Sequence, residues 1–204
     1  ASSSEVYQTP DHTPTTEKVA LIIPDILNPR YSYGGGKILC ELMTINYGKK
    51  FFDKSIIFRP HNVYGANMGW EHVIPNFITK IFKNSLNNDN STIDLEIQGN
   101  GDETRAFIYI DDFIDGLLKV YDKGKNLNIY NIGTQNEISI RDLAKKIANH
   151  FQKELKIIPG KIQEGSTKRR CPDISKICNL GFKENYTIEE GLKLTTEWYS
   201  KNIN

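Results

Sequence analysis

Several features are scarce or absent in this sequence, and each absence excludes a class of protein. The three cysteines, Cys40, Cys171 and Cys178, have neither the spacing of a zinc site nor the density of a disulfide scaffold. We therefore expect free thiols in the cytoplasm and no metal. The formal net charge is only +1, so no strong field favours nucleic acid or an anionic membrane. Apolar runs stay below the roughly 18 residues that cross a bilayer, and no secretion signal opens the chain.

The first 30 residues predict a chain that starts inside a domain. Ala1–Tyr7 lacks an initiator methionine and resembles the end of a buried strand that runs into a loop. The following segment, Gln8–Arg30, is rich in proline, threonine and aspartate, which predicts a long loop of the kind that covers a site.

The remaining sequence alternates between two kinds of pattern, which indicates the α/β class. Helical periodicity predicts helices at 31–47, 72–84, 113–121, 140–151 and 188–199. Short apolar runs predict strands at 55–59, 95–97, 106–110, 128–132 and 155–158. We expect Asp111 or Asp112 to cap the third helix and Ser139 to begin the fourth. The first helix should carry an apolar face made by Ile38, Leu39, Leu42, Met43 and Ile45.

Tyr33 and Lys37 are the strongest candidates for chemistry. They are four residues apart on a predicted helix, so their side chains lie one turn apart on one face. An ammonium near a phenol favours the phenolate, which equips the tyrosine to take a proton from a hydroxyl. Three glycines, 34 to 36, separate the pair, although each costs a helix interior roughly 1 kcal/mol relative to alanine. They predict close approach of a cofactor, a substrate or a neighbouring helix; the alternative is a flexible loop.

Ser3, Ser4 and Glu5 form a second candidate group. They fall where a strand is predicted to end. A hydroxyl there could hydrogen-bond a reacting oxygen, and Glu5 could act as a further acid or base. A run of serines is also an ordinary turn signal.

The order of these motifs resembles that of extended short-chain dehydrogenases/reductases, the nucleotide-sugar epimerases, dehydratases and decarboxylases. The resemblance covers essentially the whole chain. It rests on Ser2–Tyr7, Tyr33-x-x-x-Lys37, Arg59–Gly65, Gly99–Arg105, Ile108–Asp112, Tyr130–Gly133, Arg169–Lys176 and Leu180–Phe182. It implies the C-terminal part of a Rossmann-type parallel sheet plus a small mixed α/β substrate-binding lobe. Residues 1–65 would form the truncated catalytic part and 66–204 mainly the lobe, with a strand and helix around 106–132 returning to the sheet.

The resemblance also implies a role for each matching residue. Ser3, Tyr33, Lys37 and Glu5 would be catalytic, and Tyr33, Lys37 and His61 would bind NAD. The nucleotide-diphosphate sugar would be held by Ser4, Asn62, Val73, Gln98, Arg105 and Arg170. A guanidinium group matches the geometry of phosphate oxygens, which supports the assignment of Arg105 and Arg170 to the diphosphate. The alternative for the basic segment 168–170 is a solvated loop.

Two departures from the family pattern stand out. The glycine-rich phosphate loop that anchors the ADP half of the cofactor is absent, so we expect a fragment of a longer enzyme that does not hold NAD or turn over by itself. Gln98 stands where many relatives place an aromatic residue against the nucleotide base, which leaves the base undetermined.

The expected reaction is epimerisation, in which oxidation of the sugar C4 hydroxyl gives a 4-keto intermediate that is then reduced again. A nucleotide-uronic acid decarboxylase is the first alternative, because Ser4-Glu5, Pro29-Arg30 and Arg170 resemble its motifs. A 4,6-dehydratase would have adjacent aspartate and glutamate where this chain has Ser4-Glu5. A reductase and an inactive nucleotide-binding scaffold also remain open. We expect a homodimer formed through the helix 31–47.

Overall fold

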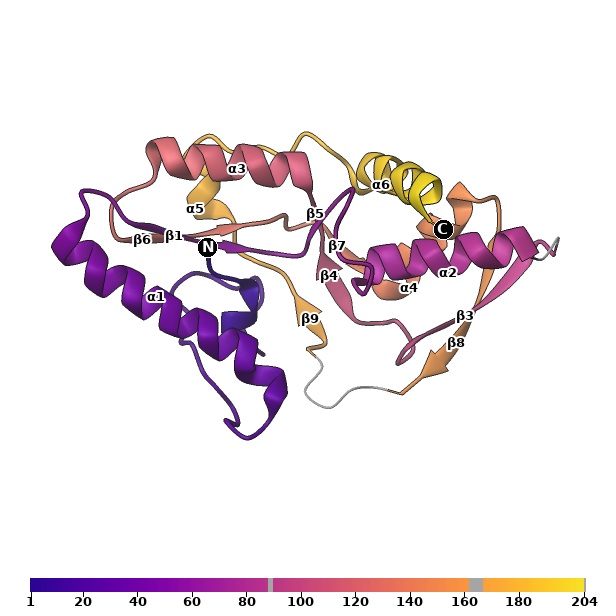
Figure 1. The fold of residues 1–204 in the computed structure, drawn as a ribbon, viewed down its shortest axis with the longest axis horizontal. Coiled ribbons are helices and arrows are strands. Elements are labelled where there is room, and N and C mark those ends of the chain that lie inside the picture. The colour runs from indigo at the N-terminus through magenta and orange to yellow at the C-terminus, as the bar shows by residue number, and fades with distance from the viewer. Residues whose placement is uncertain (88–89, 162–166, 204) are drawn as a thin grey trace. The chain divides into compact units, whose positions relative to one another are not determined.

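The computed structural model describes residues 1–87, 90–161 and 167–203, which form two compact units. Unit 1 contains residues 1–63, 106–136 and 170–185, whereas unit 2 contains 64–105, 137–169 and 186–204 (Figure 1). Each unit is therefore assembled from segments that are far apart in the sequence. Each also contains a pair of parallel strands covered by helices, which confirms the predicted α/β class.

Unit 1 is built on two parallel strands, β1 (Ile56–Pro60) and β6 (Asn128–Ile132). Helix α3 (Ile110–Lys123) lies on one side of this pair and α1 (Ser32–Phe51) on the other (Figure 1). The further elements of the unit are η1 (Ser4–Tyr7), η2 (Pro29–Tyr31), β5 (Ile108–Tyr109) and α5 (Ser175–Cys178). Its apolar core consists of Ile108, Val120, Tyr130, Ile132, Ile174, Ile177 and Phe182.

Unit 2 is built on a second parallel pair, β3 (Thr92–Gln98) and β8 (Glu154–Gly160). Three helices pack on one another beside it: α2 (Val73–Asn87), α4 (Ile140–His150) and α6 (Ile188–Asn202). Short strands complete the structure where the chain passes between units or turns back: β2 (Val63–Tyr64), β4 (Thr104–Ala106), β7 (Glu137–Ser139) and β9 (Arg169–Arg170). The side chains of β3 alternate between buried and exposed, as expected of a strand with one covered face.

Two local predictions are wrong. The residues after Ser3 form the 3₁₀-helix η1 instead of a loop. Neither Asp111 nor Asp112 caps α3: Tyr109 precedes the helix without a side-chain cap, and the Asp112 carboxylate accepts the backbone N–H of Asn185 at 2.9 Å. Aspartate in the first turn still benefits from the helix dipole, which explains why the sequence resembles a cap.

Helix α1 spans the glycine run, so the loop alternative is excluded. Its buried residues are Gly34, Gly35, Glu41 and Gly48. Three side chains of the predicted apolar face are exposed: Leu39 is 62% exposed, Leu42 55% and Met43 58%. The glycines allow the backbone of α1 to approach the remainder of unit 1 closely. The apolar side chains of the helix lie on the surface.

Candidate active site

The segment that carries Ser3, Ser4 and Glu5 lies beside β1 in unit 1. The backbone N–H of Ser2 donates to the carbonyl of Phe58 at 2.8 Å. Ser3 is the N-cap of η1, and its Oγ accepts the backbone N–H of Glu5 at 3.2 Å. Because a hydroxyl can donate while it accepts, the Ser3 hydroxyl keeps its proton for a ligand.

The three glycines of α1 have different surroundings. A Cβ on Gly34 would lie 2.8 Å from the backbone oxygen of Glu5, so this glycine lets α1 touch η1. A Cβ on Gly35 would lie 3.1 Å from the side chain of Ile23, and one on Gly36 would meet nothing within 4 Å. Gly34 therefore brings the Tyr33 helix against the serine segment, as the sequence predicts for a close approach.

Tyr33 and Lys37 lie one turn apart at the start of α1, as predicted. Lys37 Nζ is 5.8 Å from the centre of the Tyr33 ring and donates to the carbonyl of Ala1 at 3.1 Å. The Tyr33 side chain is 58% exposed, so its phenol is accessible to a ligand. Contact between α1 and η1 places this pair in the same part of unit 1 as Ser3 and Glu5.

Glu5 and Arg170 form an ion pair across 165 residues of sequence. Arg170 Nη1 contacts Glu5 Oε1, and its Nη2 lies 3.4 Å from Oε2. The Arg170 side chain is 14% exposed, whereas Arg169 is exposed and pairs with Glu137 in unit 2. The basic segment is thus not simply a solvated loop, because Arg170 is held beside the serine segment of unit 1.

A buried polar network lies below this group, and sequence reasoning missed it. Arg59 is 1% exposed and contacts Glu41 through two hydrogen bonds of 2.8 and 2.6 Å. It also donates to the Tyr7 hydroxyl at 2.6 Å, which in turn donates to Asn131. Burial raises the pKa of Tyr7 to about 12, so this tyrosine stays neutral and is no base. An arginine that ends the apolar run 56–58 was the available signal, because a buried charge requires a partner.

His61 and Asn62 follow β1. His61 is 1% exposed; its Nε2 lies 3.1 Å from Asn131 Oδ1, and its Nδ1 has no hydrogen-bond partner within the described residues. Burial lowers the pKa of His61 from 6.5 to about 4, so the ring is neutral at pH 7. Asn62 has a positive φ of 40° and donates to the carbonyl of Ala106 at 3.1 Å. Asparagine tolerates this left-handed backbone, so Asn62 also shapes the turn.

The other three predicted site residues lie in unit 2. Val73 begins α2, and Gln98 is an exposed residue at the end of β3. Arg105 is half-buried on β4 and donates to the carbonyls of Thr104 and Thr167, each at 2.7 Å. In this structure the Arg105 guanidinium thus supports the backbone of its own unit.

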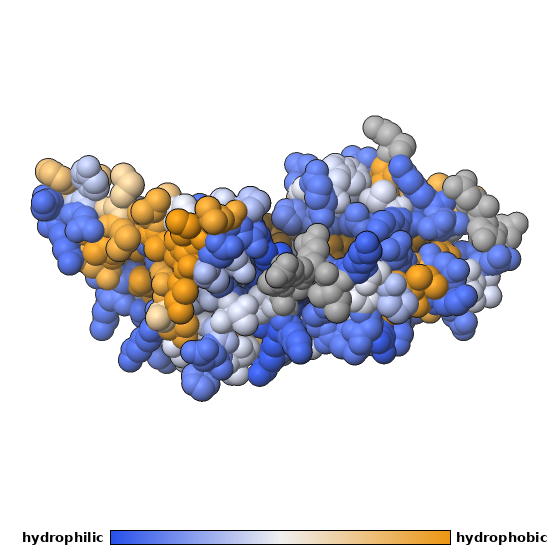
Figure 2. Space-filling model, turned by 90° about the horizontal axis from the view of Figure 1, so that it is seen from below, coloured by the Kyte–Doolittle hydropathy of each residue, from blue (hydrophilic) through white to orange (hydrophobic). Residues whose placement is uncertain are grey.

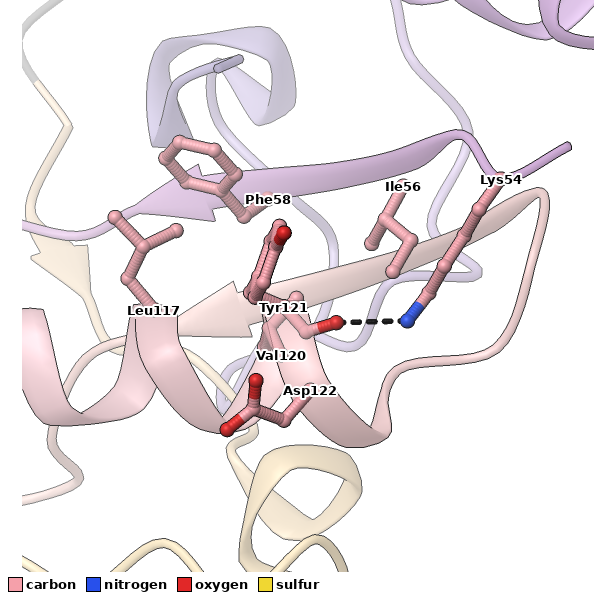
Figure 3. Close-up of a pocket in the computed structure, with 7 residues that line it drawn as sticks. All are labelled: Lys54, Ile56, Phe58, Leu117, Val120, Tyr121 and Asp122. Atoms are coloured by element: carbon pink, nitrogen blue, oxygen red, sulfur yellow. Dashed lines mark hydrogen bonds between the residues drawn. The ribbon is translucent and has the colours of Figure 1, made fainter. Parts of the chain in front are cut away.

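A cavity of about 600 Å³ in unit 1 contains none of these residues (Figure 3). It lies between β1 and α3 and is lined by Lys54, Ile56, Phe58, Leu117, Val120, Tyr121 and Asp122. Most of this lining is apolar, and the lysine donates to the carbonyl of Tyr121 at 2.7 Å. The apolar part of this surface suits packing, and Asp122 is the carboxylate among its lining residues.

The part of the chain that the structure describes contains no cluster of metal-ligating side chains and no helix that is long and apolar enough to span a membrane. No disulfide joins the three cysteines. The clustered polar groups of unit 1 are therefore the candidate site: two serines, a tyrosine–lysine pair and a carboxylate–guanidinium pair.

Comparison with known proteins identifies the family of this chain. Residues 1–133 match the model of the NAD dependent epimerase/dehydratase family. The chain belongs to this family. Its members are NAD-dependent enzymes of the epimerase and dehydratase type that act on nucleotide sugars, as the motifs predict.

Individual relatives include enzymes of both types. A dTDP-D-glucose 4,6-dehydratase of Dictyostelium discoideum is 32% identical to this chain. The alignment covers 88% of this chain and 48% of that protein. The crystal structure of a dTDP-glucose 4,6-dehydratase from Bacillus anthracis in complex with NAD is 25% identical, with a TM-score of 0.79 and coverage of 98% and 60%. UDP-glucose 4-epimerase from Thermotoga maritima with UDP-glucose has the same fold, with 24% identity, a TM-score of 0.83 and coverage of 100% and 63%. The chain thus spans about half the length of the Dictyostelium relative.

Proposed function

We propose that these residues form the catalytic and sugar-binding part of an NAD-dependent nucleotide-sugar 4-epimerase. The observation that carries the proposal is the contact of α1 with η1 at Gly34, because it brings an accessible Tyr33 and Lys37 together with Ser3. The ion pair of Glu5 and Arg170 adds a charged border to the same group.

Each of these side chains has a role in the first half-reaction. Tyr33 takes the proton of the sugar C4 hydroxyl, and the Lys37 ammonium lies 5.8 Å from the centre of the Tyr33 ring. The Ser3 hydroxyl donates a hydrogen bond to the C4 oxygen as a carbonyl forms there. In the second half, after the keto sugar has turned over, C4 receives the hydride back on its other face and Tyr33 returns the proton to the C4 oxygen, which gives the C4 epimer.

The chain's own groups fit the nicotinamide end of NAD, which supplies the hydride acceptor when it is bound. Lys37 offers ammonium protons to ribose hydroxyls, and the space beside Gly36 is open. The neutral His61 ring has an unused acceptor, Nδ1, which we assign to the same side of the site.

We assign nucleotide-sugar binding residue by residue. Asn62 and Arg170 in unit 1 provide amide and guanidinium donors that suit diphosphate oxygens, and Arg105 in unit 2 carries a guanidinium of the same chemistry. Ser4, Val73 and Gln98 would contact the remainder of the substrate. We accordingly propose that unit 2 is mainly the substrate-binding lobe.

A 4,6-dehydratase is the second candidate, because the 32%-identical relative of Dictyostelium is named as one. Dehydration requires an acid for the C6 hydroxyl next to a base for the C5 proton. Ser4 is a poor acid, and Glu5 is engaged by Arg170. These two residues favour epimerisation.

The test incubates the full-length enzyme that contains these residues with NAD and, separately, UDP-glucose, dTDP-glucose and UDP-glucuronate, and follows the sugars by proton NMR. The proposal predicts a C4 epimer and a loss of activity of about 10²-fold or more in Tyr33→Phe. A 4-keto-6-deoxy product would instead establish the dehydratase, and carbon dioxide release from UDP-glucuronate the decarboxylase. Activity of Tyr33→Phe equal to the parent would support a scaffold role.

We further propose that the protein forms a homodimer and is located in the cytoplasm. The exposed stripe of α1 consists of Leu39, Leu42, Met43, Tyr47 and Phe51, and Figure 2 shows apolar side chains gathered over this helix. Contiguous apolar surface of this kind marks an interaction site, and a second copy would present the same stripe. Three cysteines without a disulfide suit a reducing compartment.

A further inference from the structure

A buried ion pair joins the middle of α1 to the end of β1. Arg59 is 1% exposed and Glu41 6%, and the guanidinium contacts both carboxylate oxygens, at 2.8 and 2.6 Å. Removing two charges from water is costly, and well-packed apolar residues often stabilise a protein at least as well. Stability alone is therefore a weak explanation for this pair, whereas its planar, two-point geometry defines an orientation.

Glu41 has a particular position on α1. It follows Lys37 by four residues and Tyr33 by eight, so the three side chains follow one face of the helix. The other buried residues of α1 are Gly34, Gly35 and Gly48, which have no side chains to interlock with neighbours. Contact through glycines lets a helix approach closely but defines its rotation poorly. Lys37 adds an exposed hydrogen bond to the carbonyl of Ala1, and the buried directional contact of this face is the one that Glu41 makes.

The guanidinium that holds Glu41 also holds the serine segment. Arg59 Nη1 donates to the hydroxyl of Tyr7 at 2.6 Å, and Tyr7 is the last residue of η1. The Tyr7 hydroxyl then donates to Asn131 Oδ1 on β6 at 2.7 Å. One arginine thus ties α1 and η1, the two elements that carry Tyr33 and Ser3, to the parallel strands.

We propose that Glu41 and Arg59 are positioning residues, which set the rotation of α1 and thereby the place of Tyr33 and Lys37 relative to Ser3. The catalytic consequence rests on the proposed function, whereas the effect on α1 does not. A misplacement of about 1 Å lowers turnover by about 10²-fold.

The decisive variant replaces both partners, Glu41→Met with Arg59→Leu, because this leaves no unpaired buried charge. We expect a folded protein whose thermal midpoint equals or exceeds that of the parent. Its kcat per folded molecule should fall at least about tenfold, while the KM for the nucleotide sugar stays within about twofold. Arg59→Lys, which keeps the charge without the planar fork, should retain an intermediate kcat. A double variant with kcat within about twofold of the parent overturns the proposal.

A second measurement reads the position of α1 without any reaction. Cys40 on α1 and Cys178 on α5 are exposed and Cys171 is buried, so spin labels attach to one site on each of these two helices, both of which belong to unit 1. Labelled protein is diluted with unlabelled protein. Pulsed electron paramagnetic resonance then measures the distance between the two labels of one chain. The parent should give one narrow distance distribution and the double variant a broad one; an unchanged distribution overturns the proposal. Activities of the parent and of the variants are measured in the full-length enzyme that contains these residues. If that parent converts no nucleotide sugar, the proposed function fails, and the distance measurement still decides the role of the pair.

Discussion

Gly34 and Gly36 differ by two positions, yet the structure assigns them opposite sensitivities. A Cβ on Gly34 would lie 2.8 Å from a backbone oxygen of η1, which cannot move without shifting the serine segment. Gly34→Ala should therefore destabilise the protein by about 1–3 kcal/mol. A Cβ on Gly36 meets nothing within 4 Å, so Gly36→Ala should stabilise it by up to about 1 kcal/mol. Urea unfolding of the two variants measures both effects, and equal destabilisation would contradict the assignment.

His61 predicts a stability that depends on pH. Burial lowers its pKa from 6.5 to about 4 in the folded state, so as the pH falls the unfolded chain binds the proton first. The contribution of the neutral ring is complete above pH 6.5 and is lost progressively between 6.5 and 4. From pH 7 to pH 5 the loss is about 2 kcal/mol.

Urea midpoints measured across this range check the prediction, with His61→Asn as the control. The variant should lack this part of the slope, because asparagine does not titrate. A parent and a variant with the same pH dependence would show that His61 is not the responsible group.

At the scale of a single element, we propose two roles for helix α1: it places the catalytic pair beside η1, and it forms the dimer interface. Its glycine face contacts η1, and its apolar stripe faces outward. Met43→Glu, at a position that is 58% exposed, should convert a dimer into a monomer at micromolar concentration because it places a charge in the stripe. Lys49→Glu changes charge at an exposed polar position of the same helix and should leave the dimer intact. Light scattering measures both, and a parent that is already monomeric contradicts the dimer.

At the scale of the whole molecule, the proposed substrate residues come from both compact units. Ser4, Asn62 and Arg170 belong to unit 1, and Val73, Gln98 and Arg105 belong to unit 2. The chain spans about half the length of its Dictyostelium relative, so the activity and the substrates assigned to these units are proposals.

Sequence pattern alone determined the α/β class, the main helices and strands, and the family. These features depend on short-range physics: the helical period, apolar runs, and the four-residue spacing of Tyr33 and Lys37. Ser139 shows the same, since its hydroxyl accepts the N–H of Asp142 and begins α4 as predicted. Such signals lie within a few neighbouring residues, so they can be recognised without the tertiary structure.

Only the tertiary structure decided which groups meet. Glu5 pairs with Arg170 across 165 residues, and Glu41 pairs with Arg59 from a different element. Periodicity predicts the apolar face of α1, whereas its exposure within unit 1 is read from the structure, because a repeat does not show which neighbour covers a face. Burial and partner choice depend on how distant segments pack, and here the glycines of α1, with no side chains, give that helix its buried face.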